Sequence, residues 1–109
     1  MHKLIITGRT NSGKSFFKKT IEGLTNMEIV ESNSRTFLSI YKEGDKIVVV
    51  DTPAIICSIR SGLAFSVADQ KREDDILLYV TELPSCTIIK NIGSLDDFRV
   101  KIKKFMKTI

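Results

Sequence analysis

Apolar residues along the chain fall into short continuous runs and into segments with helical spacing. The first run predicts a strand over residues 3–7. Large apolar side chains at helical spacing predict a helix over residues 14–24. A second run, residues 47–50, has four consecutive apolar positions and is typical of a strand buried on both faces. The predicted helical face consists of Phe17, Ile21 and Leu24.

The middle of the chain is less regular. Residues 27–35 are rich in asparagine and serine, which predicts an exposed, mobile loop. Apolar and polar residues partly alternate over residues 36–41, and a Glu-Gly-Asp turn follows at 43–45. We therefore expect residues 36–41 to pair with the 47–50 strand in an antiparallel hairpin.

The second half of the chain supplies three further elements. Residues 55–70 predict an irregular segment that runs into a helix, and the apolar run 76–80 predicts another buried strand. Ser94 has the character of an N-cap for a helix over residues 94–107, because acidic residues follow it. One face of that helix carries Phe98, Ile102, Phe105 and Ile109. Four strands and about three helices indicate an α/β fold.

Residues 8–15 have the spacing of a phosphate-binding loop, with two glycines five positions apart followed by Lys14 and Ser15. The glycines let backbone amides turn inward around phosphate oxygens, and the next helix adds its positive N-terminal end. We expect Lys14 to contact the β and γ phosphates and Ser15 to ligate Mg²⁺. The alternative is an ordinary glycine-rich turn. The candidate nucleotide-binding residues are Gly8, Arg9, Thr10, Asn11, Ser12, Gly13, Lys14, Ser15, Phe16, Asp51 and Ala54.

Asp51 ends the 47–50 strand, and Thr52 and Pro53 follow it. At the carboxyl end of a strand beside the phosphate-binding loop, this carboxylate would hold Mg²⁺. The alternative is that Asp51 only begins a proline turn. A hydroxyl from the preceding loop would complete the metal shell, and Thr36 is the first candidate, with Ser34 as the second.

The two motifs together resemble the P-loop GTPases of the translation-factor-related class. The loop and the Asp51-Thr52-Pro53 sequence are similar to the Era and ribosome-assembly branch. The chain also resembles the immunity-associated, GIMAP-type (AIG1-type) GTPases. That second likeness rests on Leu4-Ile5-Ile6-x-Gly8, Gly13-Lys14-Ser15, Ile21-Glu22-Gly23 and the valine-rich strand before Asp51. The resemblance covers roughly the first half of such a domain.

The resemblance implies one truncated G domain over residues 1–109. Its fold would be a three-layer P-loop NTPase-like sheet, mostly parallel with one antiparallel hairpin strand. Its activity would be binding of GTP or GDP with Mg²⁺ and slow hydrolysis, because Ile55 stands where Ras-like enzymes place a water-positioning glutamine. Two alternatives stay open: a non-catalytic interaction module derived from a GTPase, and a P-loop ATPase or kinase fragment.

Two family features are absent from the sequence. Ala54 replaces the glycine whose amide senses the γ-phosphate in the family, so a nucleotide-driven switch would be blunted. No Asn-Lys-x-Asp sequence follows the loop, so the guanine specificity cannot be inferred from the residues. Asn11 matches an asparagine that helps to hold a potassium ion in some Era-like members, which implies potassium-stimulated hydrolysis coupled to dimerisation. The alternative role of Asn11 is local turn hydrogen bonding.

In a truncated domain the 76–80 strand would lie at the edge of the sheet. An apolar edge strand favours pairing with another chain. We therefore expect a homodimer, or association with another GTPase, through that edge. The alternative is that the C-terminal helix folds over the edge and covers it.

Composition and charge add little to these expectations. The chain is 42% hydrophobic and 28% charged, with 17 basic and 13 acidic residues, a net charge of +4 and a pI of about 9.2. The C-terminal helix carries much of the basic excess. These side chains could contact anionic membrane or RNA, and the alternative is that they only form a solvated helix face. No run approaches the ~18 apolar residues of a membrane span, so a cytoplasmic location is expected. Cys57 and Cys86 are expected to be reduced thiols.

Overall fold

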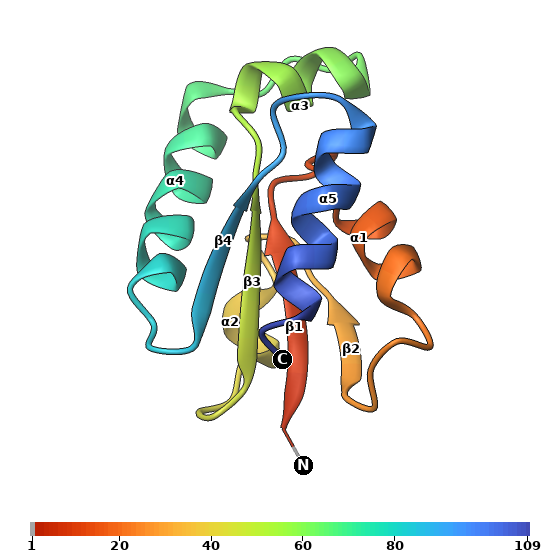
Figure 1. Cartoon of the computed structure of the whole chain (residues 1–109). Helices are drawn as coiled ribbons and strands as arrows, with labels where there is room; N and C mark the ends of the chain where they lie inside the picture. The colour runs from red at the N-terminus through yellow and green to blue at the C-terminus, as the bar shows by residue number, and fades with distance from the viewer. Residues whose placement is uncertain (1) are drawn as a thin grey trace.

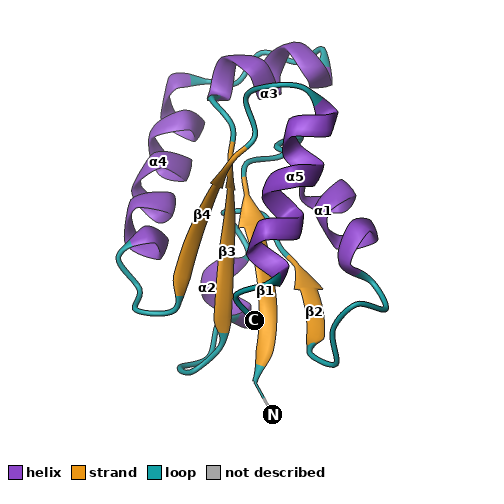
Figure 2. Ribbon diagram, in the orientation of Figure 1, coloured by secondary structure: helices purple, strands orange, loops and turns teal. Residues whose placement is uncertain are grey.

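The computed structural model describes residues 2–109 and is built on a four-stranded parallel sheet in the order β2-β1-β3-β4 (Figure 1). Helices cover both faces of this sheet (Figure 2). The strands are β1 (Lys3–Gly8), β2 (Glu28–Glu31), β3 (Lys46–Asp51) and β4 (Cys86–Lys90). The helices are α1 (Lys14–Ile21), α2 (Phe37–Ile40), α3 (Ala54–Ser61), α4 (Val67–Thr81) and α5 (Leu95–Met106).

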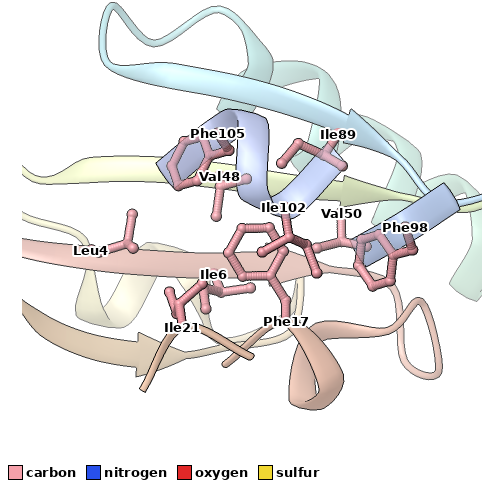
Figure 3. Close-up of a cluster of buried hydrophobic side chains, with 10 residues drawn as sticks. All are labelled: Leu4, Ile6, Phe17, Ile21, Val48, Val50, Ile89, Phe98, Ile102 and Phe105. Atoms are coloured by element: carbon pink, nitrogen blue, oxygen red, sulfur yellow. The ribbon is translucent and has the colours of Figure 1, made fainter. Parts of the chain in front are cut away.

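Two hydrophobic cores sandwich the sheet. Since successive side chains of a strand point to opposite faces, β1 and β3 contribute to both cores. The core between the sheet and helices α1 and α5 consists of Leu4, Ile6, Phe17, Ile21, Val48, Val50, Ile89, Phe98, Ile102 and Phe105 (Figure 3). The core under α2 and α4 consists of Ile5, Phe37, Ile47, Val49 and Val80.

The structure confirms the α/β class and three of the predicted elements. β1, β3 and α5 occupy the predicted positions, and the Ser94 hydroxyl caps α5 by accepting the amide of Asp97 at 3.2 Å. The predicted 14–24 helix begins at Lys14 but ends at Ile21, because Glu22 takes an extended ψ of 130°. Leu24 is consequently exposed.

The predicted antiparallel hairpin is wrong, because every strand pair in the sheet is parallel. Part of its first arm, residues 37–40, is the short helix α2, whose Phe37, Ile40 and Tyr41 reach the second core at helical spacing. The Asn33 side chain starts this turn by accepting the amides of Arg35 and Thr36. The predicted loop 27–35 contains β2, which pairs with β1.

The prediction of a strand over residues 76–80 is also wrong. These residues belong to α4, a helix that Ser66 caps by accepting the amide of Asp69 at 3.1 Å. Ile76, Leu77 and Val80 pack on the second core, whereas Leu78 and Tyr79 are 63% and 46% exposed. Three residues of the run therefore form the buried face of a helix, and two point to solvent. In a strand buried on both faces, all five side chains would be buried.

The sequence analysis missed two strands, β2 and β4, and β4 rather than residues 76–80 forms the edge of the sheet beyond β3. The strand order reverses between β1 and β3, because β1 leads to β2 on one side while β3 and β4 lie on the other. In open parallel sheets ligands bind outside the carboxyl ends of the strands at such a reversal. Among the helices of residues 2–109, none combines the length and apolar character of a membrane span.

Candidate functional site

The loop between β1 and α1 occupies the point where the strand order reverses, and two of its glycines are required by their surroundings. Gly8 and Gly13 have φ values of 151° and 110°, which L-residues rarely adopt. A Cβ atom would lie 2.5 Å from the Val50 carbonyl oxygen at Gly8, and 2.5 Å from the Asn91 Nδ2 atom at Gly13. The loop is therefore closely packed against the ends of β3 and β4, and only glycine fits at these two positions.

Lys14, the first residue of α1, folds back over this loop. Its Nζ atom donates to the carbonyl oxygens of Gly8 at 3.1 Å and Arg9 at 2.6 Å. Burial of the ammonium lowers the pKa of Lys14, and the carboxylate of Glu31 opposes that shift most strongly. The ammonium of Lys14 has only neutral backbone carbonyls as hydrogen-bond acceptors, and a buried charge is more stable with a partner of opposite charge. The site therefore favours an anion.

The mouth of the loop opens into a cavity of about 690 Å³ between α1 and the end of β2. Lys14, Ser15 and Thr36 all line this cavity, together with Glu31, so the structure brings Ser15 and Thr36 to the same space. The Ser15 hydroxyl donates to Glu31 Oε1 at 2.8 Å, and Thr36 bonds to the Asn33 side chain. Full lining of the cavity comprises Thr10, Asn11, Lys14, Ser15, Lys18, Ile29, Val30, Glu31, Ser32, Asn33 and Thr36.

Ser12 fixes the loop to the neighbouring strands. Its carbonyl oxygen accepts the Thr52 hydroxyl at 3.0 Å and the Asn91 side-chain amide at 2.7 Å. Thr52 follows β3 and Asn91 follows β4, so one carbonyl joins the loop to the ends of two strands. The Ser12 hydroxyl is buried and has no partner within residues 2–109. The Ser12 side chain is fully buried and lines none of the cavities around the loop, so its predicted contact with nucleotide stays a prediction.

Arg9 and Asn11 connect the loop to the helices on its other side. Arg9 is largely buried and pairs with Glu73 at 3.4 Å and with Asp74, both on α4. Asn11 has a positive φ of 64°, a conformation that asparagine tolerates better than most residues. Its carbonyl oxygen accepts Nη1 of Arg60 on α3 at 3.1 Å. The positive φ accounts for an asparagine at this position, and both predicted roles of its side chain, turn hydrogen bonding and cation binding, stay predictions.

A sequence model of the 50S ribosome-binding GTPase family matches residues 3–108. The chain belongs to this GTPase family. The match extends over nearly the whole chain, and membership of this family indicates a GTP-binding domain. No curated protein sequence matches the chain.

The remaining predicted residues of this GTPase domain lie around the loop. Asp51 ends β3, half-buried, with its backbone carbonyl bonded to the Asn91 amide at 2.9 Å, but it does not line the 690 Å³ cavity. Ala54 is the first residue of α3, so its amide lies at a helix N-terminus. Its φ is not positive, so an alanine fits here without backbone strain. Phe16 stacks on Phe98 with ring centroids 5.7 Å apart.

Sequence reasoning missed three residues of the GTPase site: Glu31, Asn91 and Arg60. Asn91 comes two positions after the apolar pair Ile88-Ile89 and directly after β4, and polar site residues commonly follow strands, so this weak signal could have identified it. Residues 91–94 are Asn-Ile-Gly-Ser, which does not match Asn-Lys-x-Asp, and Ser94 serves as the cap of α5. Glu31 and Arg60 have no local signal, because their roles depend on contacts with distant residues.

Proposed function

We propose that the chain binds GTP and GDP together with Mg²⁺ and hydrolyses GTP slowly. The observation that carries this proposal is the position of Lys14 and Ser15 at the mouth of the polar cavity, at the N-terminus of α1. The first amides of a helix have no partners within it, so they are available to phosphate oxygens. Lys14 would exchange the two loop carbonyls for phosphate oxygens.

The donor set around Ser15 fits a hard divalent cation, which prefers oxygen ligands. Ser15 and Thr36 supply hydroxyls to the cavity, and Glu31 supplies a carboxylate 2.8 Å from the Ser15 hydroxyl. Asp51 would hold Mg²⁺ from the end of β3, directly or through water. When bound, Mg²⁺ would neutralise phosphate charge, and Glu31 would release Ser15 to the metal.

Slow hydrolysis is proposed because an isoleucine stands where Ras-like enzymes have the glutamine that positions the attacking water. Ile55 follows Ala54, and its side chain is 70% exposed on α3. We propose that the domain is related to the Era-like and GIMAP-type GTPases, and that it lies in the cytoplasm, where free thiols such as Cys57 and Cys86 persist. A non-catalytic interaction module remains the alternative, with the same loop but no turnover.

Calorimetric titration of the protein with GTP, GDP and ATP, each with and without Mg²⁺, tests the proposed function. We expect GTP and GDP to bind in the micromolar range, more tightly with Mg²⁺, and ATP to bind more weakly. Binding of ATP in preference to GTP would support a P-loop ATPase or kinase fragment instead. Absence of binding for all three nucleotides would reject nucleotide binding and leave the interaction module.

Association through the sheet edge is a separate proposal, now assigned to β4. The amide of Ile47 donates to the Ser85 carbonyl and that of Asn91 to the Asp51 carbonyl, so alternate residues of β4 bond to β3. The backbone N–H and C=O of Ile88 lie between these positions and therefore face outward. The Ile88 side chain is 48% exposed. A second copy, or another GTPase, would add a strand here.

An edge proline tests this association. Ile88→Pro removes the outward N–H without breaking a bond to β3, since proline is tolerated at sheet edges. The measurement is the molar mass from gel filtration with light scattering at micromolar concentration. We expect the wild type to exceed the monomer mass and Ile88→Pro to be monomeric. Ile88→Ala keeps the N–H and should stay associated. A monomeric wild type, alone and mixed with a full-length GTPase, would contradict the proposal.

A further inference from the structure

Arg60 lies in the last turn of α3, which ends at the left-handed residue Gly62. The guanidinium reaches the phosphate-binding loop, where Nη1 donates to the Asn11 carbonyl at 3.1 Å. Within residues 2–109 it has no carboxylate partner within 4.0 Å, unlike Arg9, Arg35 and Arg99. An exposed arginine held on a loop by one carbonyl keeps its remaining N–H donors free.

The free donors of Arg60 face the phosphate-binding residues. Arg60 lines a cavity of about 270 Å³ with Gly13, Lys14 and Ser15. This cavity shares Asn11, Lys14, Ser15 and Glu31 with the 690 Å³ cavity, so the two meet at the mouth of the loop. Arg60 approaches that mouth from α3, whereas Thr36 approaches it from α2. A phosphate chain seated at Lys14 and Ser15 would therefore have Arg60 on one side.

We propose that Arg60 binds the terminal phosphate of a bound nucleoside triphosphate and makes the site prefer the triphosphate over the diphosphate. This inference rests on the proposed nucleotide binding and adds a residue to it. Arginine suits the role because its planar group donates two parallel hydrogen bonds to one phosphate and remains charged at every physiological pH.

In this role Arg60 would detect the terminal phosphate in place of the family glycine that Ala54 replaces. Ala54 stands where related GTPases use a glycine amide near the γ-phosphate, and it is fixed as the first residue of α3. Arg60 extends from the other end of the same helix to the loop. Exchange of the Asn11 carbonyl for a phosphate oxygen would move the guanidinium and α3 together. The presence of the terminal phosphate would thereby be transmitted to the segment that follows β3.

A potassium ion held by Asn11 is the other possible source of positive charge at this position. Arg60 donates to the backbone carbonyl of Asn11, so an ion bound at that oxygen would lie beside the guanidinium. The two cations repel each other at such a distance. Arg60 and potassium are therefore alternatives, and a comparison of potassium and sodium salts distinguishes them.

The test compares affinities of Mg²⁺-GTP and Mg²⁺-GDP for the wild type, Arg60→Ala and Arg60→Lys by calorimetry in KCl and in NaCl. We expect Arg60→Ala to weaken GTP binding by about 10- to 100-fold and GDP binding less than about twofold, since one charged bidentate contact is lost. Arg60→Lys should recover part of the GTP affinity. Arg72→Ala, an exposed arginine on α4, is the matched control and should change neither affinity.

The outcomes separate this inference from the proposed function. Equal losses for GTP and GDP, or no loss, would overturn the role of Arg60 while leaving nucleotide binding intact. GTP affinity that depends on potassium in the wild type and is unchanged in Arg60→Ala would assign the position to the ion and also reject the inference. A wild type that binds neither nucleotide would remove the proposed function, and the inference with it. Thermal unfolding of Arg60→Ala, expected within a few degrees of the wild type, controls for folding.

Discussion

Replacing Lys14 with alanine is expected to weaken GTP binding by at least about 100-fold, because the ammonium supplies charged hydrogen bonds that each contribute about 1.5–3 kcal/mol. The same change should alter the free energy of unfolding by less than about 1 kcal/mol. Lys14 donates to the carbonyls of Gly8 and Arg9, but these also accept the amides of Ser34 and Ser12, both at 3.1 Å. Relief of the desolvation that lowers the Lys14 pKa offsets the two lost bonds.

Calorimetric titration measures the affinity of Lys14→Ala, and urea unfolding measures its stability. Lys19→Ala, an exposed lysine of the same helix, is the matched control and should bind GTP like the wild type. A Lys14→Ala variant that keeps wild-type GTP affinity would show that the loop does not use its lysine for phosphate. A variant that loses several kcal/mol of stability would show that Lys14 has a structural role instead.

Phe17→Ala is expected to destabilise the fold by about 3–5 kcal/mol, the usual cost of removing a buried aromatic ring. Phe17 is fully buried, and its ring lies 6.1 Å from that of Phe98 and 5.7 Å from that of Phe105 (Figure 3). It therefore joins α1, which begins at the phosphate-binding loop, to α5. A domain of this size has only about 5–15 kcal/mol of stability, so the variant would lose a large part of it.

The change in stability can be measured by urea unfolding followed by circular dichroism. Leu24→Ala, just beyond the end of α1, removes a side chain that is 67% exposed and should cost less than about 0.5 kcal/mol. Phe17→Leu should be intermediate, since it keeps part of the buried volume. Equal stabilities for Phe17→Ala and Leu24→Ala would mean that α1 and α5 do not form the core described above.

The sequence predicted those elements whose signals are local. The loop at residues 8–15 carries its spacing within eight positions, β3 is apolar on consecutive residues, and α5 has both a cap and a helical stripe. The run at 76–80 was ambiguous, because five consecutive apolar residues fit either a buried strand or a wide helical face. The helix formed because the preceding capped and charged segment continues into it.

The candidate site was predictable only where its residues follow one another in the chain. Lys14 and Ser15 were identified by the loop motif, and both line the same cavity. The bond from Asn91 to Ser12 joins residues 79 positions apart, and the Arg60 contact with Asn11 joins residues 49 apart. Such pairs depend on the order of the strands in the sheet. That order differed from the prediction, because residues 76–80 belong to a helix and β4 is the edge strand.

The bonds at the Ser12 carbonyl affect how the loop can open. Thr52 and Asn91 both donate to this oxygen, and they belong to segments that leave different strands. Fraying of β4 alone would release one donor and keep the other, so local motion at the sheet edge need not free the loop. The amide of Ser12 itself, which donates to the Arg9 carbonyl at 3.1 Å, should therefore exchange with deuterium more slowly than the amides of the exposed residues Thr10 and Asn11. The loop would then stay preformed between rounds of ligand binding.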